Sequence, residues 1–336
     1  MPGSAKLLVG VDGGNTKTAA VICDAEGQAL GFAVGGASNW ESMGETRAAA
    51  VILQVIDEAL GQAGFGRGDL LHVHMGLAGQ DWPEDEPRMR TALLQAGWCA
   101  GLTLENDGFL TIRAGAPEGR GVGVTAGTGI CCAIIRPDGS KFVYAAFTDL
   151  GGGYDTSGET VRAVIRAEDG RGAPTALTPA LLEATGHATV VDLVHAMHRE
   201  GEMPSHRTVR PALFSTAASG DPVAVDIVTR FAAELALCAA NLLRRYNLAD
   251  QDTAVVASGS LFMKTGRLLF DAFCREVLKV APRARMILTD HPPVMGAVRG
   301  ALFACGLDQP TVWQRLNREA SSKGWFQQPS QTEEES

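Results

Sequence analysis

The stretch Leu7-Leu8-Val9-Gly10-Val11-Asp12-Gly13-Gly14-Asn15-Thr16-Lys17 decides the fold of this chain. An apolar run ends in Asp12, and a glycine-rich polar turn leads into a second apolar run over residues 18–23. A hairpin turn over residues 24–27 and a third run that ends at Gly35-Gly36 complete the pattern. Apolar runs of this length, separated by turn residues, predict a three-stranded meander.

The same pattern recurs between Gly121 and Gly153. Strand-like runs flank the turn Thr125-Ala126-Gly127-Thr128-Gly129, and a hairpin turn at 136–139 precedes a third run over 141–147. Because a repeated sequence pattern marks a repeated structural unit, we expect two similar lobes.

The domain organisation follows from this repeat and from chain length. The 336 residues, 46% of them hydrophobic, are enough for two cores. Helices are expected at 46–63, where apolar residues recur on one face, and from Asp221-Pro222, a capping residue before proline. We predict an α/β fold of two lobes with a cleft between them. The expected boundaries are 1–115 for the N-terminal lobe, 116–291 for the C-terminal lobe, 292–305 for a helix that packs back on the first lobe, and 319–336 for a disordered tail.

Composition excludes several classes of protein. The net charge is −9, and no basic block is present, so we expect no nucleic-acid partner. No apolar run is long enough to span a bilayer, and residues 1–6 lack the features of a secretory signal. The seven cysteines are scattered and none forms Cys-x-x-Cys, which favours a reducing compartment. We therefore expect a cytoplasmic protein without a membrane partner, and we expect a homodimer.

The turn after the first strand has the chemistry of a nucleotide site. Asp12 stands at a strand end, where its carboxylate can hold the hydration shell of Mg²⁺. Glycines allow a close approach of the backbone, and the residues after them supply amides, a hydroxyl and a cation for phosphate. The alternative is a plain hairpin turn, which Asp-Gly-Gly also favours. The candidate phosphate-binding residues are Gly13, Gly14, Asn15, Thr16 and Lys17.

Two further turns fit the same ligand. Thr128 and Gly129 occupy the equivalent turn of the second copy, and the two turns together would clamp a triphosphate such as that of ATP. Ser258-Gly259 follows an apolar strand, and such a turn lets adenine or ribose approach the backbone.

Asp107 is the candidate general base. It follows a short predicted strand and the residues Glu105-Asn106, near the join between the two copies. A carboxylate there can orient a hydroxyl nucleophile and take its proton during phosphoryl transfer. The alternative is that Asp107 only caps a helix over 108–113.

Three residues are candidates for binding a polar substrate. Asn39 can bridge sugar hydroxyls and Trp40 can stack on C–H groups, although both also suit a helix cap with a packed indole. Asp149, beside the glycine run 151–153, can accept hydrogen bonds from sugar hydroxyls, although that run can equally be a flexible loop.

The order of these motifs resembles the ASKHA superfamily of sugar kinases and actin. Within it, residues 6–305 resemble the BadF/BadG/BcrA/BcrD-type ATPase family, and in particular its N-acetylglucosamine kinase branch. The matching motifs are Asp12-Gly13-Gly14-Asn15-Thr16-Lys17-Thr18, Gly76-Leu77-Ala78-Gly79, Glu105-Asn106-Asp107, Gly127-Thr128-Gly129, Val255 to Gly259 and Pro293 to Ala301. The resemblance implies a two-lobed actin/hexokinase-like, ribonuclease H-like fold.

The resemblance also implies a reaction. Asp107 would deprotonate the 6-hydroxyl of an amino sugar while Asn39 and Asp149 hold the ring. Phosphorylation of N-acetylglucosamine by ATP is the leading expectation, and glucosamine is the near alternative. A different class is the ATPase that activates 2-hydroxyacyl-CoA dehydratases or benzoyl-CoA reductases, whose iron–sulfur cluster needs paired cysteines. Here Cys131-Cys132 lies within a predicted strand.

Overall fold

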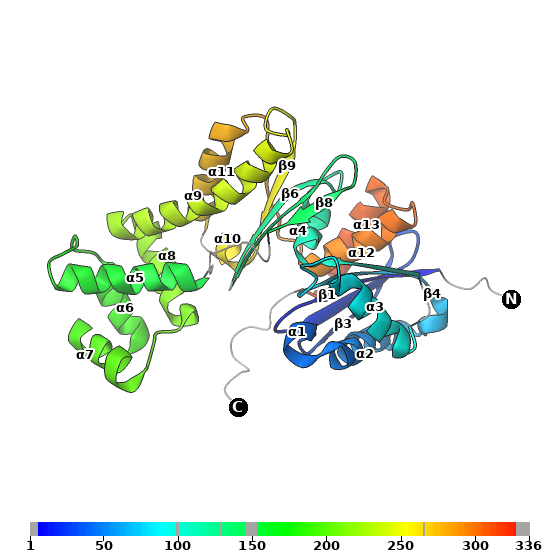
Figure 1. Ribbon diagram of the computed structural model, residues 1–336, viewed down its shortest axis with the longest axis horizontal. Helices are drawn as coiled ribbons and strands as arrows, with labels where there is room; N and C mark the ends of the chain where they lie inside the picture. The colour runs from blue at the N-terminus through cyan, green and yellow to red at the C-terminus, as the bar shows by residue number, and fades with distance from the viewer. Residues whose placement is uncertain (1–5, 99–100, 128, 145–152, 265, 327–336) are drawn as a thin grey trace. The chain divides into compact units, whose positions relative to one another are not determined.

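The computed structural model describes residues 6–98, 101–127, 129–144, 153–264 and 266–326 (Figure 1). The chain forms two compact units. Unit 1 comprises the residues up to Gly119 and those from His291 onward, and unit 2 runs from Arg120 to Asp290. Within the described residues each unit contains one five-stranded sheet.

The sheet of unit 1 grows from the first meander. Its strands are β1 (Leu7–Gly13), β2 (Thr18–Cys23), β3 (Ala29–Gly35), β4 (Leu70–Leu77) and β5 (Gly101–Asn106). The spatial order is β3-β2-β1-β4-β5. Strands β1 to β3 pair antiparallel, whereas β4 and β5 run parallel to β1. Polar residues that follow β1, β4 and β5 therefore come to one edge of this sheet.

Helices cover both faces of this sheet. They are α1 (Trp40–Met43), α2 (Glu45–Ala63), the 3₁₀ turn η1 (Arg67–Asp69), α3 (Asp85–Gln95), α4 (Gly108–Gly115), α12 (Pro293–Ala304) and α13 (Pro310–Ser322). The apolar stripe of α2 is buried against one face, with Ile52 and Ile56 fully covered. Helix α12 packs on the other face, where Val298 meets Leu8 and Val21.

Unit 2 repeats this sheet topology. Its strands are β6 (Gly121–Ala126), β7 (Ile130–Ile135), β8 (Lys141–Val143), β9 (Ala254–Ser258) and β10 (Arg285–Leu288). Their order, β10-β9-β6-β7-β8, places two parallel strands beside an antiparallel meander, as in unit 1. The predicted α/β fold with a duplicated meander, of the actin/hexokinase-like type, is confirmed.

Unit 2 also has a helical part that unit 1 lacks. Its helices are α5 (Gly153–Glu168), α6 (Leu177–Thr185), α7 (Val190–His195), the π-helical turn η2 (Ala196–Glu200), α8 (His206–Ala218), α9 (Pro222–Arg245), α10 (Ser260–Lys264) and α11 (Leu268–Val280). Helices α5 to α8 gather beyond one end of α9 in Figure 1. The predicted start of α9 is confirmed, because Asp221 accepts a hydrogen bond from the backbone N–H of Ala224 at 2.9 Å. Within the described ranges, no helix combines the length and apolarity needed to cross a membrane.

The boundaries differ from the predicted ones in two places. The first crossing between units lies after Gly119 rather than after residue 115. The predicted disorder from residue 319 is wrong up to residue 326, the last one described. Helix α13 continues to Ser322, and the rings of Trp325 and Phe326 pack on Phe32 with centroids 5.6 and 5.3 Å away. The packing of these aromatic side chains buries apolar surface, which the mostly polar sequence around them does not indicate.

Candidate functional site

The hairpin between β1 and β2 forms an accessible polar turn. The Gly14 N–H donates to the carbonyl of Lys17 at 3.0 Å and closes the turn. Gly13 leaves no room for a side chain, because a Cβ there would lie 2.6 Å from Ser38 Oγ. Residues 15–17 are exposed. Backbone and side-chain donors of this turn can therefore reach a ligand.

Two carboxylates stand at the parallel edge of the unit 1 sheet. Asp12 is the second-last residue of β1 and Asp107 directly follows β5, with β4 between the two strands. Burial and, to a smaller extent, the negative charge of Asp107 raise the pKa of Asp12 to about 7, against the opposing charge of Lys17. Burial also raises the pKa of Asp107 to about 6, with a contribution from Asp81. Negative charge is thus costly at both groups and would be relieved by a cation.

The side chain of Asp107 does not cap the helix that it precedes. It occupies the N-cap position of α4 without a capping hydrogen bond from its side chain. The neighbouring Asn106 accepts from the Gly108 N–H at 2.8 Å and donates to Asp81 Oδ1 at 2.7 Å. Because Asn106 does the local capping, the structure disfavours the alternative in which Asp107 is only a cap.

A buried ion pair anchors the same segment. The Glu105 carboxylate is 2.7 Å from both His74 Nε2 on β4 and Arg113 Nε on α4. Glu105 is only 6% exposed, and its pKa is held well below the ordinary value: burial opposes this shift, and the His74 and Arg113 contacts outweigh it. Through Glu105, the end of β5 is therefore bound both to strand β4 and to helix α4. These contacts fix the segment that leads into Asp107.

Asn39 and Trp40 lie beside the turn between β1 and β2, but both already have hydrogen-bond partners. Asn39 caps α1 by accepting from the Glu41 N–H at 2.9 Å, and its amide donates to Asn15 Oδ1 at 2.7 Å. The Trp40 indole N–H donates to the Gly79 carbonyl at 2.6 Å, and the Arg88 guanidinium lies 4.3 Å from the ring centroid. Asn39 is therefore a helix cap and Trp40 a packed indole, as the alternative for these residues predicts. Asn39 also joins this cap to the β1–β2 turn.

Unit 2 brings its two predicted turns together. The parallel register of β6 and β9 pairs Thr125 with Ser258 at the strand ends. Gly259 has φ +98°, and a Cβ there would lie 2.3 Å from the Ala126 carbonyl oxygen. Gly259 is thus required for the close approach of the two turns. Gly129 belongs to the first of them, whereas Thr128 and Asp149 lie outside the described residues.

The sequence over residues 9–304 matches the model of the BadF/BadG/BcrA/BcrD ATPase family. The chain belongs to this family. Membership of an ATPase family shows that the chain uses ATP.

Curated relatives of this family member are sugar kinases. It is 24% identical to the N-acetylmuramic acid/N-acetylglucosamine kinase of Clostridium acetobutylicum, over 89% of this chain and 99% of the relative. It is also 24% identical to the N-acetyl-D-glucosamine kinase of Dictyostelium discoideum, over 89% and 98%. The glucosamine kinase of Vibrio cholerae is 27% identical over 68% of this chain and 77% of the relative.

Solved structures share the fold of this ATPase family member. A Chromobacterium violaceum protein with the provisional name N-acetylglucosamine kinase superposes with a TM-score of 0.65 at 23% identity, covering 91% of this chain and all of that one. A ROK family glucokinase from Streptomyces griseus gives a TM-score of 0.56 at 20% identity, covering 88% and 98%.

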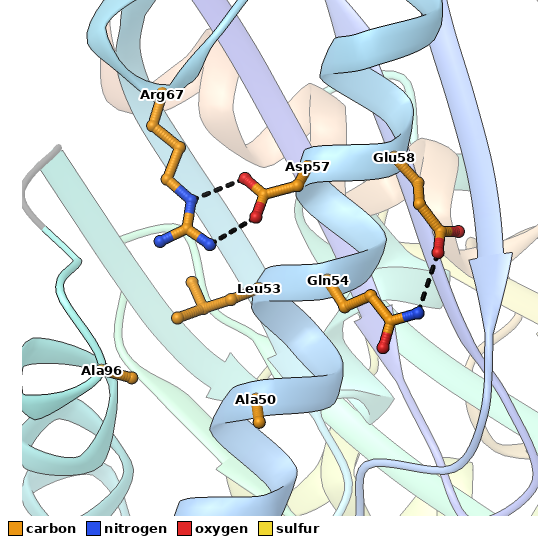
Figure 2. A pocket seen from close by; sticks show the side chains of 7 residues that line it. All are labelled: Ala50, Leu53, Gln54, Asp57, Glu58, Arg67 and Ala96. Atoms are coloured by element: carbon orange, nitrogen blue, oxygen red, sulfur yellow. Dashed lines mark hydrogen bonds and ion pairs between the residues drawn. The ribbon is translucent and has the colours of Figure 1, made fainter.

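A hollow elsewhere on unit 1 does not belong to the site. Figure 2 shows this hollow, of about 540 Å³, beside α2. Its polar side chains satisfy one another: Arg67 holds Asp57 through two contacts of 2.6 Å, and Gln54 donates to Glu58 at 2.9 Å. None of the predicted site residues within the described part of the chain lines it. The parallel edge of the sheet remains the better candidate in unit 1.

Three residues at the parallel edge of the unit 1 sheet could not be assigned a role from the sequence: Asp81, Glu105 and Asn106. The roles of Asn106 and Glu105 depend on partners from other elements, and Asp81 follows the Gly76–Gly79 motif without being part of it. The one available signal was the position of Asp81, because polar residues after parallel strands gather at one edge of a sheet.

Proposed function

We propose that the chain is an ATP-dependent kinase that phosphorylates the 6-hydroxyl of an amino sugar, with N-acetylglucosamine as the first candidate. The observation that carries the proposal is the Asp107 carboxylate, which is not used as a helix cap and stands at the same sheet edge as the Asp12 turn. The relatives that act on N-acetylglucosamine or glucosamine support the choice of sugar.

In this proposal Asp107 orients the sugar hydroxyl and takes its proton. A base is most effective when its pKa lies near the working pH, and the pKa of Asp107 is raised to about 6. The proton can then leave as the oxygen attacks phosphorus. Asn39, Trp40 and Asp149 are proposed to contact the sugar, with Asn39 held in place by Asn15.

The phosphates of ATP are proposed to bind the turns Gly13 to Lys17 and Thr128-Gly129, and the adenosine to bind near Ser258-Gly259. The donor set fits magnesium, because Asp12 supplies the hard oxygen ligand that Mg²⁺ prefers and its negative charge is costly. Among the described residues, no group of three or more side chains is arranged to hold a metal ion. An ion at Asp12 would therefore take most of its ligands from phosphate and water, and it would supply neutralisation of the phosphate charge.

The activator-type alternative is less well supported. Cys131 and Cys132 both lie in β7, which pairs with β6 on one side and β8 on the other. Successive side chains of a strand point to opposite faces, so these two thiols cannot act as a pair. Burial raises the pKa of Cys132 well above the ordinary value, which opposes formation of the thiolate that ligates metal.

We also propose that the chain acts in the cytoplasm. No disulfide joins the cysteines of the described residues, which suits a reducing compartment. The homodimer stays a prediction.

The proposal is tested by an ADP-release screen against amino sugars and hexoses, with Asp107→Asn as the variant. We expect N-acetylglucosamine or glucosamine to give the highest rate. The variant should lose about 100- to 10,000-fold in kcat, because the amide cannot accept the proton. A non-hydrolysable ATP analogue should still bind, as measured by calorimetry.

The matched control is Asp57→Asn, which removes a carboxylate of an exposed ion pair away from the site. Its turnover should stay near that of the unaltered chain. Turnover of Asp107→Asn close to this control would remove Asp107 from the mechanism, and release of ADP with no sugar at all would contradict the kinase.

A further inference from the structure

The helical part of unit 2 contains a cavity of about 970 Å³. It lies among α5, the η2 turn that follows α7, and the start of α8, elements that are gathered together in Figure 1. Its volume falls in the range of sites that bind small molecules. None of the predicted ATP- or sugar-binding residues that the structure describes lines it; Thr128 and Asp149 lie outside the described residues.

The lining of the cavity combines apolar and cationic groups. Val161 and Ile165 of α5 and Met197 and Met203 from the following segments supply the apolar part. The cationic residues are Arg162, Arg166, Arg171, His206 and Arg207. None of the described residues that line the cavity carries a carboxylate, in a chain whose net charge is −9. The charge of the cavity wall is therefore positive, whereas the net charge of the chain as a whole is negative.

Carboxylates outside the cavity balance only part of this charge. Arg162 pairs with Glu159, and Arg171 pairs with Asp169 at 2.5 Å. Arg166 and Arg207, by contrast, make no ion pair with a carboxylate among the described residues. Arg166 donates to the Arg171 carbonyl at 3.3 Å, and its charge also acts on Asp169. Both guanidinium groups are exposed and can meet an anion that enters the cavity.

Helix α8 begins with cations where its dipole disfavours them. His206, Arg207 and Arg210 all lie in its first five positions, although the N-terminus of a helix carries partial positive charge. Burial lowers the pKa of Arg210, and Arg207 lowers it further; burial also lowers the pKa of His206. In the described chain, Arg210 Nη1 is buried without a hydrogen-bond partner. An anion bound in the cavity would offset the positive charge of His206 and Arg207, which line it.

We propose that this cavity binds a small organic anion, a phosphate or carboxylate group carried on an apolar chain or ring. The anionic group meets Arg166 and Arg207, and the apolar portion covers Val161, Ile165 and the methionines. A bare inorganic anion leaves the apolar lining exposed, and a neutral apolar molecule leaves the arginines without a counter-charge.

The test measures binding to the full chain by calorimetry, with hexyl phosphate and hexanoate as probes and inorganic phosphate and hexanol as comparators. A non-hydrolysable ATP analogue and N-acetylglucosamine are present at saturation, so that the proposed catalytic residues are occupied. We expect at least one of the two amphipathic anions to bind about tenfold or more tightly than either comparator. The readout is binding and not turnover, so the outcome is separate from that of the kinase proposal.

Two variants locate the site. Arg166→Gln with Arg207→Gln should weaken the probe about tenfold or more, whereas Arg267→Gln with Lys279→Gln removes the same charge from α11 and should leave binding unchanged. Met203→Glu, at a residue that is 66% exposed, should also weaken binding by placing a carboxylate in the cavity. Amphipathic anions that bind no better than the comparators, or equally well to the Arg166/Arg207 variant, would overturn the proposal.

Discussion

The three consecutive residues at the end of β5 have three different tasks. Glu105 anchors the segment to His74 and Arg113, and Asn106 caps α4 and holds Asp81. Asp107 makes no capping hydrogen bond with its side chain and is proposed to act as the base. This division explains how a carboxylate at the N-cap position of α4 avoids the capping role that its residue type favours.

The pH dependence of activity should be sensitive to Asp81, the carboxylate that neighbours the proposed base Asp107. Asp107 must be deprotonated to act, and its pKa is about 6, so kcat/KM for the sugar should fall as pH drops through about 6. Asp81 raises this pKa by its negative charge. Asp81→Asn should therefore move the acid limb of the profile to lower pH. A pH–rate profile of both forms measures the shift.

The substitution keeps the hydrogen bond from Asn106, because an asparagine oxygen can accept it in place of the carboxylate. Asp57→Asn, which changes an exposed carboxylate elsewhere in unit 1, should leave the limb in place. If Asp81→Asn also leaves it in place, Asp81 does not set the protonation of Asp107.

At the residue scale, the sequence predicted where site residues stand relative to strand ends better than it predicted which residues they contact. Asp12 and Asp107 could be placed at strand ends, because an apolar run followed by a polar turn fixes where a strand stops. The pairing of Glu105 with Arg113 could not be predicted, since it depends on how α4 turns back over β5. The residue type of Trp40 leaves stacking on a sugar and packing as an indole both open, and its contacts with Gly79 and Arg88 depend on two distant segments.

At the scale of elements, glycines set how closely α12 packs on the sheet of unit 1. A Cβ on Gly10 of β1 would lie 2.0 Å from the backbone nitrogen of Val298. A Cβ on Gly296 would lie 2.0 Å from the Leu110 carbonyl oxygen of α4, and one on Gly300 would lie 2.7 Å from the ring of His74. Gly10 and Gly296 thus lie against backbone and Gly300 against a buried ring, at positions where a larger residue cannot fit.

Gly296→Ala should destabilise unit 1. Alanine normally stabilises a helix interior by about 0.5–1 kcal/mol relative to glycine, but here its methyl group would overlap backbone that cannot move aside. We expect a loss of about 1–3 kcal/mol or more in the free energy of unfolding, measured by urea denaturation.

The same substitution at Gly61 is the matched control. Gly61 lies inside α2, and a Cβ there would have nothing within 4 Å. Gly61→Ala should therefore raise stability by about 0.5–1 kcal/mol. Effects of the same sign at Gly61 and Gly296 would show that helix propensity, and not the close approach, decides both.

At this scale the long elements were predictable and the short ones were not. Helix α2 has an apolar face that recurs with the helical period, and α9 has a cap followed by proline, so both are visible in the sequence. The third strand of the second copy is expected over 141–147; β8 covers Lys141–Val143, and residues 145–147 lie outside the described part of the chain. A short edge strand is fixed by its neighbour and not by its own pattern.

At the scale of the whole molecule, unit 1 is assembled from both ends of the chain. Arg299 of α12, only 6% exposed, is central to this assembly. Its guanidinium donates to the carbonyls of Arg113, Ala116 and Pro117, at 2.9, 2.7 and 2.5 Å, just before the chain leaves unit 1. It also donates to Asp308 at 2.9 Å, ahead of α13. These bonds hold residues 116–119 in unit 1, which moves the boundary beyond the one that sequence alone predicted.

Replacing Arg299 should therefore unfold unit 1 far more readily than replacing a surface arginine. Arg299→Met leaves Asp308 and three carbonyls without their donor and should cost about 3–5 kcal/mol. Arg299→Lys should recover only part of this loss, because a single ammonium cannot reproduce the planar set of donors. All five tryptophans of the chain lie in unit 1, so tryptophan fluorescence during urea denaturation reports this unit. Arg67→Met, at the exposed pair in Figure 2, should cost no more than about 1 kcal/mol, and an equal loss at both positions would show that Arg299 adds nothing beyond a surface ion pair.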